Sequence, residues 1–245
     1  MSRPFVLSRA ITRPWWAWLA LAAAVVCLIW PAQSGAAPPS ATLQGEITRI
    51  APGKHRVALT FDGDAFVGRV SDILAALKTY HASATFFLTS YYMEQNPSRT
   101  RAMVAAGQEV ASHGYRHQDY RDLSDGAIGR ALVAWDAEYR SLTGKHGPAI
   151  WRAPYGYTDN RVRGVAAQAG YSTVYWTLDA LDTVGSPKSA SFIFNRLTRS
   201  GITLDGSILL LHVNPNGTVD ALPRVLANLQ ARGLDVVSVS GLLAR

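Results

Sequence analysis

Residues 56–88 read RVALTFDGDAFVGRVSDILAALKTYHASATFFL and hold one complete strand–helix–strand unit. The runs 57–61 and 84–88 are short and predominantly apolar, which is typical of buried strands. Between them, apolar side chains recur at three-to-four-residue spacing from Val70 to Leu77, which predicts an amphipathic helix. A strand, a crossover helix and a second strand form the repeating unit of a parallel sheet.

The same alternation continues to the C-terminus. Further strands are predicted at 109–112, 149–152, 172–176, 207–211 and 235–239, and further helices at 99–106, 125–142, 161–169, 191–199 and 221–231. No composition break separates these units, so we expect one domain over 56–245. About seven parallel strands with crossover helices favour an α/β fold of the (β/α) barrel type, with an open sheet as the alternative.

The N-terminus has a different composition. Three arginines within the first 13 residues precede an uncharged apolar run at 15–30, and small residues follow at 33–37. This order is typical of a secretory signal peptide, and the length of the run also allows an uncleaved membrane anchor. We therefore expect residues 1–37 to be a signal peptide or anchor and 38–55 to be a linker. The protein is then secreted or retained in the cell envelope.

The net charge and the cysteine content limit the classes of binding partner and the chemistry that we expect for this protein. The net charge is +7, and it falls to +4 without the three leader arginines. A mildly basic exported domain suits an anionic wall polymer, and no basic stripe with interleaved aromatic residues predicts nucleic-acid binding. The single cysteine, Cys27, lies in the leader, so the domain needs neither a disulfide nor thiol chemistry.

Polar side chains follow five of the predicted strands at the C-terminal end, where α/β enzymes place their chemistry. The segments are Thr60-Phe61-Asp62-Gly63-Asp64, His113-Gly114-Tyr115-Arg116-His117, Arg152-Ala153-Pro154-Tyr155-Gly156, Asp179-Ala180-Leu181-Asp182 and Leu211-His212. Each alone has an ordinary interpretation as a turn, a strand cap or a buried histidine. Their recurrence at equivalent strand ends predicts one active site, and two histidines four residues apart can bind one metal ion.

These five ordered segments resemble the motifs of NodB-type polysaccharide deacetylases, carbohydrate esterase family 4, over residues 56–245. The second and third segments are close matches, whereas the first and fourth depart from the pattern. The resemblance implies a distorted (β/α) barrel. It also implies a metal-dependent hydrolase of non-peptide carbon–nitrogen bonds that removes acetyl groups, here expected to be N-acetyl groups, from a polysaccharide such as peptidoglycan or a chitin-type N-acetylglucosamine polymer.

The resemblance also implies catalytic roles. Asp62 is expected to be the general base, held ionised and oriented by Arg152. The backbone N–H of Tyr155 is expected to stabilise the tetrahedral oxyanion. His212 is expected to protonate the leaving amine, with Asp182 raising its pKa.

The first segment departs from the family pattern at the position that supplies a metal ligand. The family pattern has two adjacent aspartates, and the second ligates a divalent metal together with the two histidines, here His113 and His117. Gly63 occupies that position, and Asp64 follows one residue later. Positions 62 and 64 of an extended segment point to the same side, so Asp64 is our expected third ligand. The alternatives are Asp62 itself or water. Zinc is the expected metal for this donor set, and cobalt or nickel would also fit.

The fourth segment ends in Asp182-Thr183 where the family pattern has tryptophan after the aspartate, which removes an aromatic wall of the acetyl pocket. Trp176 and Tyr175 are candidates to replace it. These departures leave two alternatives beside a peptidoglycan-type deacetylase: a catalytically degraded domain that only binds glycan, and an acetylxylan O-deacetylase. A barrel hydrolase of small-molecule carbon–nitrogen bonds is a third interpretation, against which the leader argues.

Overall fold

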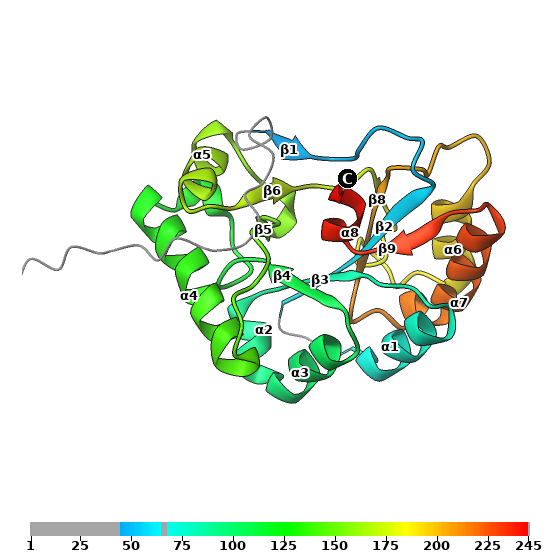
Figure 1. The fold of residues 1–245 in the computed structure, drawn as a ribbon, viewed down its shortest axis with the longest axis horizontal. Helices are drawn as coiled ribbons and strands as arrows, with labels where there is room; N and C mark the ends of the chain where they lie inside the picture. Colours follow the sequence, from blue (N-terminus) through cyan, green and yellow to red (C-terminus); the bar gives the residue numbers. More distant parts are fainter. Residues whose placement is uncertain (1–44, 65–67, 245) are drawn as a thin grey trace, which may run out of the picture. The chain divides into compact units, whose positions relative to one another are not determined.

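The computed structural model describes residues 45–64 and 68–244, and in these ranges nine strands form one sheet with only parallel ladders (Figure 1). The strands are β1 (Glu46–Ile47), β2 (Arg56–Gly63), β3 (Thr85–Leu88), β4 (Glu109–Ser112), β5 (Ile150–Trp151), β6 (Ser172–Val174), β7 (Leu178–Asp179), β8 (Ile208–His212) and β9 (Asp235–Val237). Their order is β1-β6-β5-β4-β3-β2-β8-β7, and β9 pairs with the start of β2.

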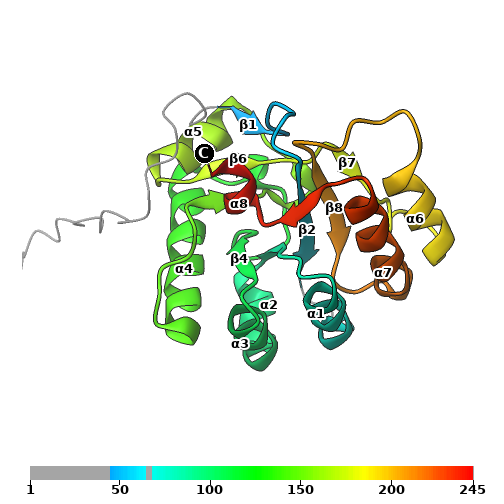
Figure 2. The same ribbon diagram turned by 45° about the vertical axis from the view of Figure 1, so that its right-hand side comes forward.

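Helices connect the strands. They are α1 (Val70–Thr79), α2 (Ser90–Gln95), α3 (Pro97–Ala105), α4 (Asp125–Thr143), α5 (Asn160–Gln168), α6 (Ala190–Thr198), α7 (Asn216–Ala231) and α8 (Val239–Leu243), with 3-10 turns at Tyr120–Asp122 and Pro154–Gly156. Figure 2 shows the longer helices along the outer side of the curled sheet. Within the described ranges, no helix is long and apolar enough to cross a lipid bilayer.

The sheet curls into a distorted (β/α) barrel, as predicted. All seven predicted strands are present, and the sequence missed β1 and β7, which have only two residues each and so show no periodicity. After β1, Arg49 forms an antiparallel bridge with Ser207, which precedes β8, so the two ends of the strand order approach each other.

One boundary prediction needs correction. Residues 38–55 were expected to be a linker, but β1 lies inside this range and pairs with β6 through Glu46 and Thr173. The sheet therefore begins about ten residues earlier than the apolar patterning indicated. The predicted leader at 1–37 lies outside the described residues.

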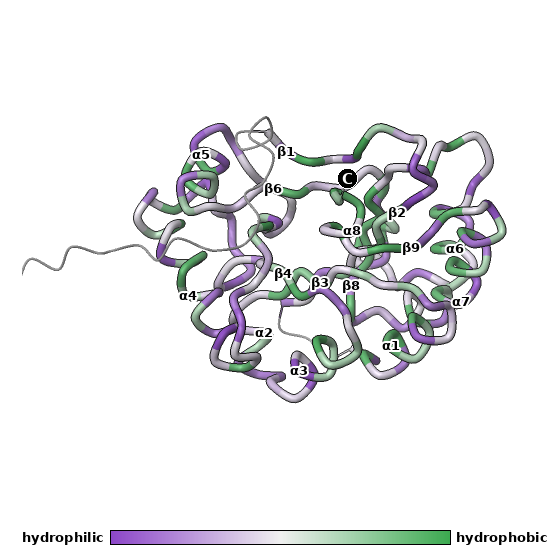
Figure 3. Tube along the Cα trace, viewed as in Figure 1, coloured by the Kyte–Doolittle hydropathy of each residue, from purple (hydrophilic) through white to green (hydrophobic). Residues whose placement is uncertain are grey.

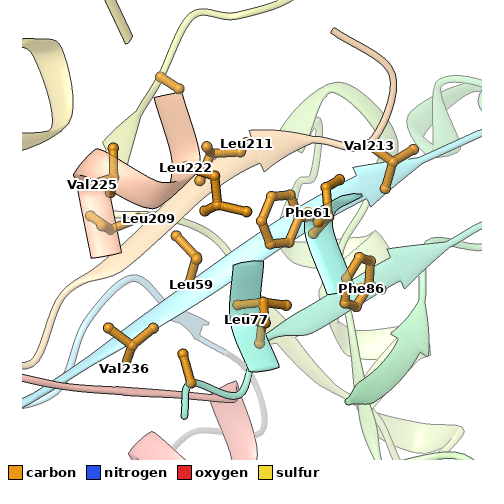
Figure 4. Packing of buried hydrophobic residues seen from close by; sticks show 14 of the residues in the cluster. Leu59, Phe61, Leu77, Phe86, Leu209, Leu211, Val213, Leu222, Val225 and Val236 are labelled. Carbon is orange, nitrogen blue, oxygen red and sulfur yellow. The ribbon is translucent and has the colours of Figure 1, made fainter. Parts of the chain in front are cut away.

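The residues of β2 alternate between two cores. Leu59 and Phe61 pack outward among the helices, where Phe61 stacks on Phe86 with ring centroids 5.1 Å apart (Figure 4). Ala58 packs inward with Phe87 in a second cluster that fills the barrel. In Figure 3, hydrophobic residues predominate along β2, β8 and β9. Because strand side chains alternate, Asp62 points to the inside of the barrel and Gly63 to the helices.

Candidate active site

Asp62 and Arg152 form a buried ion pair at the C-terminal edge of the sheet. Arg152 is 0% exposed, and its Nη1 donates to Asp62 Oδ1 at 2.7 Å and to Thr60 Oγ1 at 2.9 Å. Its Nη2 donates to the carbonyl oxygen of Tyr175 at 3.0 Å, and its guanidinium lies 4.2 Å from the ring of Phe87. These contacts fix both members of the pair.

The pKa of Asp62 follows from this pairing. Burial is the largest single influence and raises the pKa of the carboxyl group, but the charge and hydrogen bond of Arg152, together with the charges of His113 and His212, outweigh burial and hold the pKa below its ordinary value of 3.8. An arginine guanidinium stays protonated in proteins. Asp62 is therefore an ionised carboxylate at neutral pH, in the state that a general base requires.

His212 faces Asp62 from the neighbouring strand. The two residues are Cα partners in the β2–β8 ladder, and the negative charge of Asp62 acts on the imidazole of His212. His212 Nδ1 lies 2.8 Å from Asp182 Oδ1, and its backbone N–H donates to Asp182 Oδ2 at 2.9 Å. Asp182 is 3% exposed and also accepts a hydrogen bond from the hydroxyl of Thr218.

Asp182 determines the protonation of His212. Burial lowers the pKa of His212, but the hydrogen bond and charge of Asp182, together with the charges of Asp62 and Asp179, outweigh burial and raise the pKa above 6.5. The site thus combines a carboxylate whose pKa is lowered with an imidazole whose pKa is raised. Two titratable groups whose pKa values are shifted apart are typical of an acid–base pair.

The loop that carries the two histidines depends on Gly114. Its φ is +78°, and a Cβ there would lie 2.0 Å from the hydroxyl oxygen of Tyr120. That hydroxyl accepts a hydrogen bond from the backbone N–H of Tyr115 at 2.8 Å. The close approach of Tyr120 therefore holds the loop in a curled form, and it brings His113 and His117 to a ring-centroid separation of 5.3 Å.

His113 is arranged like a metal ligand. Its Nδ1 lies 2.8 Å from the carbonyl oxygen of Arg152, which leaves Nε2 as the free nitrogen of the neutral ring. Burial lowers the pKa of His113 to about 4. The Nε2 atom lies 3.8 Å from Asp62 Oδ2, which is too long for a hydrogen bond.

Imidazole nitrogens and carboxylate oxygens are suitable ligands for a divalent cation. The described residues nevertheless do not form a complete metal site. Among residues 45–64 and 68–244, no three histidine, cysteine, aspartate or glutamate side chains are arranged to hold a metal ion. Burial lowers the pKa of His117, opposed first by the negative charge of Asp64 and then by that of Asp62. The structure thus places two carboxylates near the histidine pair without completing the predicted set of His113, His117 and Asp64.

Gly63 cannot supply the missing ligand. A Cβ at this position would lie 2.9 Å from Leu88 Cδ2 and 3.1 Å from Val213 Cγ2, both in the outer apolar core. A carboxylate there would point away from the histidines. Asp64 follows the end of β2, and its carbonyl oxygen accepts a hydrogen bond from Thr89 Oγ1 at 2.8 Å.

Aromatic residues line the site on the side of β5 and β6. Tyr155 has a φ of +59°, is 53% exposed and contacts the ring of His117 edge-on at 4.3 Å between centroids. A Cβ on Gly156 would lie within 2.6 Å of both Tyr175 and Trp176, which stack at 3.8 Å. The lack of a side chain at Gly156 therefore lets Tyr175 and Trp176 approach the loop. The sequence alone did not predict this position for the two rings.

Sequence analysis did not predict three supporting contacts of the site, although it named Tyr175 as a candidate wall of the acetyl pocket. Thr60 and Tyr175 accept hydrogen bonds from Arg152, and Thr218 donates to Asp182. Thr60 had a sequence signal, because it is the only polar residue in the run 57–61. Thr218 had none, since the predicted helix began at residue 221 and the observed α7 begins at Asn216.

Comparison with known proteins agrees with this geometry. The profile of the family described as "Polysaccharide deacetylase" matches residues 49–174. A peptidoglycan-N-acetylglucosamine deacetylase of Bacillus cereus is 28% identical over 203 residues, 81% of this chain and 93% of the relative. A chitooligosaccharide deacetylase of Bradyrhizobium is 28% identical over 200 residues, 75% of this chain and 89% of the relative.

A solved structure adds a contrast. A family 4 carbohydrate esterase pseudoenzyme from Bacillus anthracis superposes with a TM-score of 0.75 at 27% identity, over 82% of this chain and 69% of that one. A mutant of that pseudoenzyme has restored enzymatic activity. The profile match spans half of this chain. The chain therefore belongs to the NodB-type polysaccharide deacetylases of carbohydrate esterase family 4, hydrolases that act on carbon–nitrogen bonds other than peptide bonds.

Proposed function

We propose that this protein is an exported, metal-dependent deacetylase that removes N-acetyl groups from a cell-wall polysaccharide, with peptidoglycan or a chitin-type N-acetylglucosamine polymer as substrate. The observation that carries the proposal is the pairing of Asp62 with His212 across β2 and β8. Each has its own buried partner, Arg152 for the base and Asp182 for the acid. The relatives named for peptidoglycan and chitooligosaccharide support the substrate class.

The chemistry follows from these residues. Asp62 accepts a proton from water as the water oxygen bonds to the acetyl carbon, and Arg152 keeps the carboxylate ionised and aimed. His212, protonated through Asp182, donates a proton to the amide nitrogen as the carbon–nitrogen bond breaks. Acetate and a free amine leave. The backbone N–H of Tyr155 is the proposed donor to the oxyanion.

His113 and His117 would hold the divalent metal, with Asp64 as the proposed third ligand and zinc as the expected ion. When bound, such an ion supplies Lewis-acid polarisation of the acetyl carbonyl and lowers the pKa of water. The fixed Nδ1 contact of His113 supports its role as a ligand through Nε2. The basic, apolar and small-residue order of residues 1–37 supports export, with the membrane contacted only through this segment if it is not cleaved.

A second candidate function is glycan binding without turnover. Two observations favour it: the incomplete metal set among the described residues, and the likeness to a pseudoenzyme of the same family. The intact acid–base pair argues for catalysis, because a domain that only binds has no use for two groups with oppositely shifted pKa values.

Acetate release distinguishes the two. The purified protein is incubated with chitooligosaccharides, peptidoglycan and acetylxylan, after treatment with chelator and after addition of zinc, cobalt or nickel. We expect acetate from an N-acetylated glycan only with metal, and none from an Asp62→Asn variant. Asp72→Asn, in an exposed pair with Arg69, is the control and should remain active. Binding of glycan with no acetate from any substrate under any metal would establish the second function.

Metal content tests the ligand assignment separately. Asp64→Ala should lower the zinc bound per protein after dialysis, and His117→Ala should lower it further. If Asp64→Ala binds as much zinc as the wild type, the third ligand is Asp62 or water.

A further inference from the structure

Arg116 is an exposed arginine in the loop between the two histidines. Its guanidinium carbon lies 4.6 Å from the ring centroid of Tyr91 and 5.8 Å from that of Tyr115. Among residues 45–64 and 68–244, the guanidinium has neither a hydrogen bond nor an ion pair. The remaining residues contain no aspartate or glutamate that could pair with it.

This side chain lies at the same edge of the sheet as the acid–base pair. Tyr91 belongs to the first turn of α2, which follows β3, and its backbone N–H donates to the carbonyl oxygen of Tyr115 after β4 at 3.1 Å. The loops after β3 and β4 are therefore joined beneath the guanidinium. Asp62 ends the adjacent strand β2.

The two rings restrict the guanidinium, and no other described residue occupies its N–H groups. An arginine over an aromatic face keeps its planar fork available for a carboxylate, and its restricted motion reduces the entropy lost on binding. Arg121 shows the contrasting arrangement: it lies 4.4 Å from the ring of Tyr157, but Asp119 already occupies its fork at 2.6 Å.

We propose that Arg116 makes this deacetylase selective for glycans that carry a carboxylate on the sugar at or beside the N-acetyl group, and that it binds this carboxylate at the rim of the site. The proposal rests on the deacetylase function proposed above and adds the charge of the substrate to it. The lactyl carboxylate of muramic acid in peptide-free wall glycan has this chemistry, whereas chitooligosaccharides have no charge.

The test compares one glycan in two charge states. Peptide-free wall glycan is used as the free carboxylate and after conversion of its carboxyl groups to amides, and kcat/KM for acetate release is measured with the full protein. We expect the wild type to prefer the carboxylate form, and Arg116→Gln to lower the ratio of the two kcat/KM values about tenfold. Arg116→Lys keeps the charge without the planar fork and should restore part of the ratio. Added salt should lower the wild-type ratio.

Arg224→Gln is the matched control, because Arg224 also lies over an aromatic ring, 4.3 Å from that of Phe194, but on helices α7 and α6. This variant should have the wild-type kcat/KM for both the carboxylate and the amide form of the glycan. A wild type that does not distinguish the two forms would overturn the proposal. So would an Arg116→Gln variant that loses activity equally on both, since Arg116 would then only support the histidine loop.

A binding measurement separates this inference from the proposed function. Equilibrium dialysis of the two glycan forms needs no turnover. If the wild type releases no acetate yet binds the carboxylate form more tightly than Arg116→Gln does, the deacetylase function fails and the carboxylate site stands. Equal binding of both forms by the wild type would refute the site.

Discussion

Replacing Arg152 with methionine should destabilise the protein in a way that depends on pH. The side chain is 0% exposed and Asp62 is 6% exposed, so methionine fills the space of the buried stem but leaves a buried carboxylate without its counter-charge. Removing one partner of a buried ion pair costs about 3–5 kcal/mol. Part of this loss comes from the acceptors on Thr60 and Tyr175 that Arg152 no longer satisfies, at about 1–3 kcal/mol, and this part does not titrate.

The remainder depends on the charge of Asp62. In the wild type its folded-state pKa lies below 3.8, so the pair contributes stability above this value and loses it as pH falls through the folded pKa. Without Arg152, Asp62 loses the largest influence that opposes burial, so its folded-state pKa should rise despite the remaining charges of His113 and His212, and protonation should relieve the penalty as pH falls through this higher pKa. The difference in unfolding free energy between wild type and variant should therefore be largest near pH 8 and smaller near pH 4.5.

Urea unfolding followed by tryptophan fluorescence, in the presence of chelator, measures both differences. Arg69→Met is the control, because Arg69 makes two ion pairs at the surface, with 46% of its side chain exposed, and its removal should change stability little at either pH. An equal loss for Arg152→Met at pH 8 and pH 4.5 would show that Arg152 stabilises by packing alone, and would refute its role as the counter-charge of the base.

Three further predictions concern the acid, the histidine loop and the first motif. Asp182→Asn should lower kcat about 10²-fold and move the alkaline edge of the pH–rate profile to lower pH, because His212 loses the charge that raises its pKa; an unmoved edge would exclude His212 as the acid. Gly114→Ala should lower the melting temperature more than Gly144→Ala. Both glycines have positive φ, at a strain of about 1–2 kcal/mol for alanine, but only at 114 does a Cβ meet a hydroxyl oxygen at 2.0 Å. Equal shifts would show that the hydroxyl moves aside freely. Gly63→Asp should cost about 3–5 kcal/mol at neutral pH without raising zinc affinity, and a gain in zinc affinity would contradict the outward orientation of residue 63.

The strands and the strand-end residues were predictable because each is a local property of the chain. A run such as 57–61 is buried on both faces of a parallel sheet, so it stays apolar through its whole length. Parallel strands share one C-terminal edge, so residues that follow different strands must meet there. The sequence alone therefore predicts that Asp62, His113, Arg152 and His212 lie at one site.

Other features depend on contacts that no local pattern records. The two-residue strands β1 and β7 exist only through pairing with β6 and β8. Trp176 and Tyr175 approach the site because Gly156 leaves room for them, and their own sequence context shows nothing of this.

The sequence by itself determined the alternating fold and the position of Asp62, His212 and the two histidines of the loop at strand ends, because periodicity and strand ends are local properties of the chain. The tertiary structure shows the contact between Asp182 and His212 that the family resemblance implied. It alone decided that Gly63 faces the outer core and that Arg116 lies over two rings, with its fork unpaired among the described residues. Each of these depends on residues from separate strands or loops brought within a few ångströms. Such distances are set by the packing of the whole sheet and not by the spacing of residues in the chain.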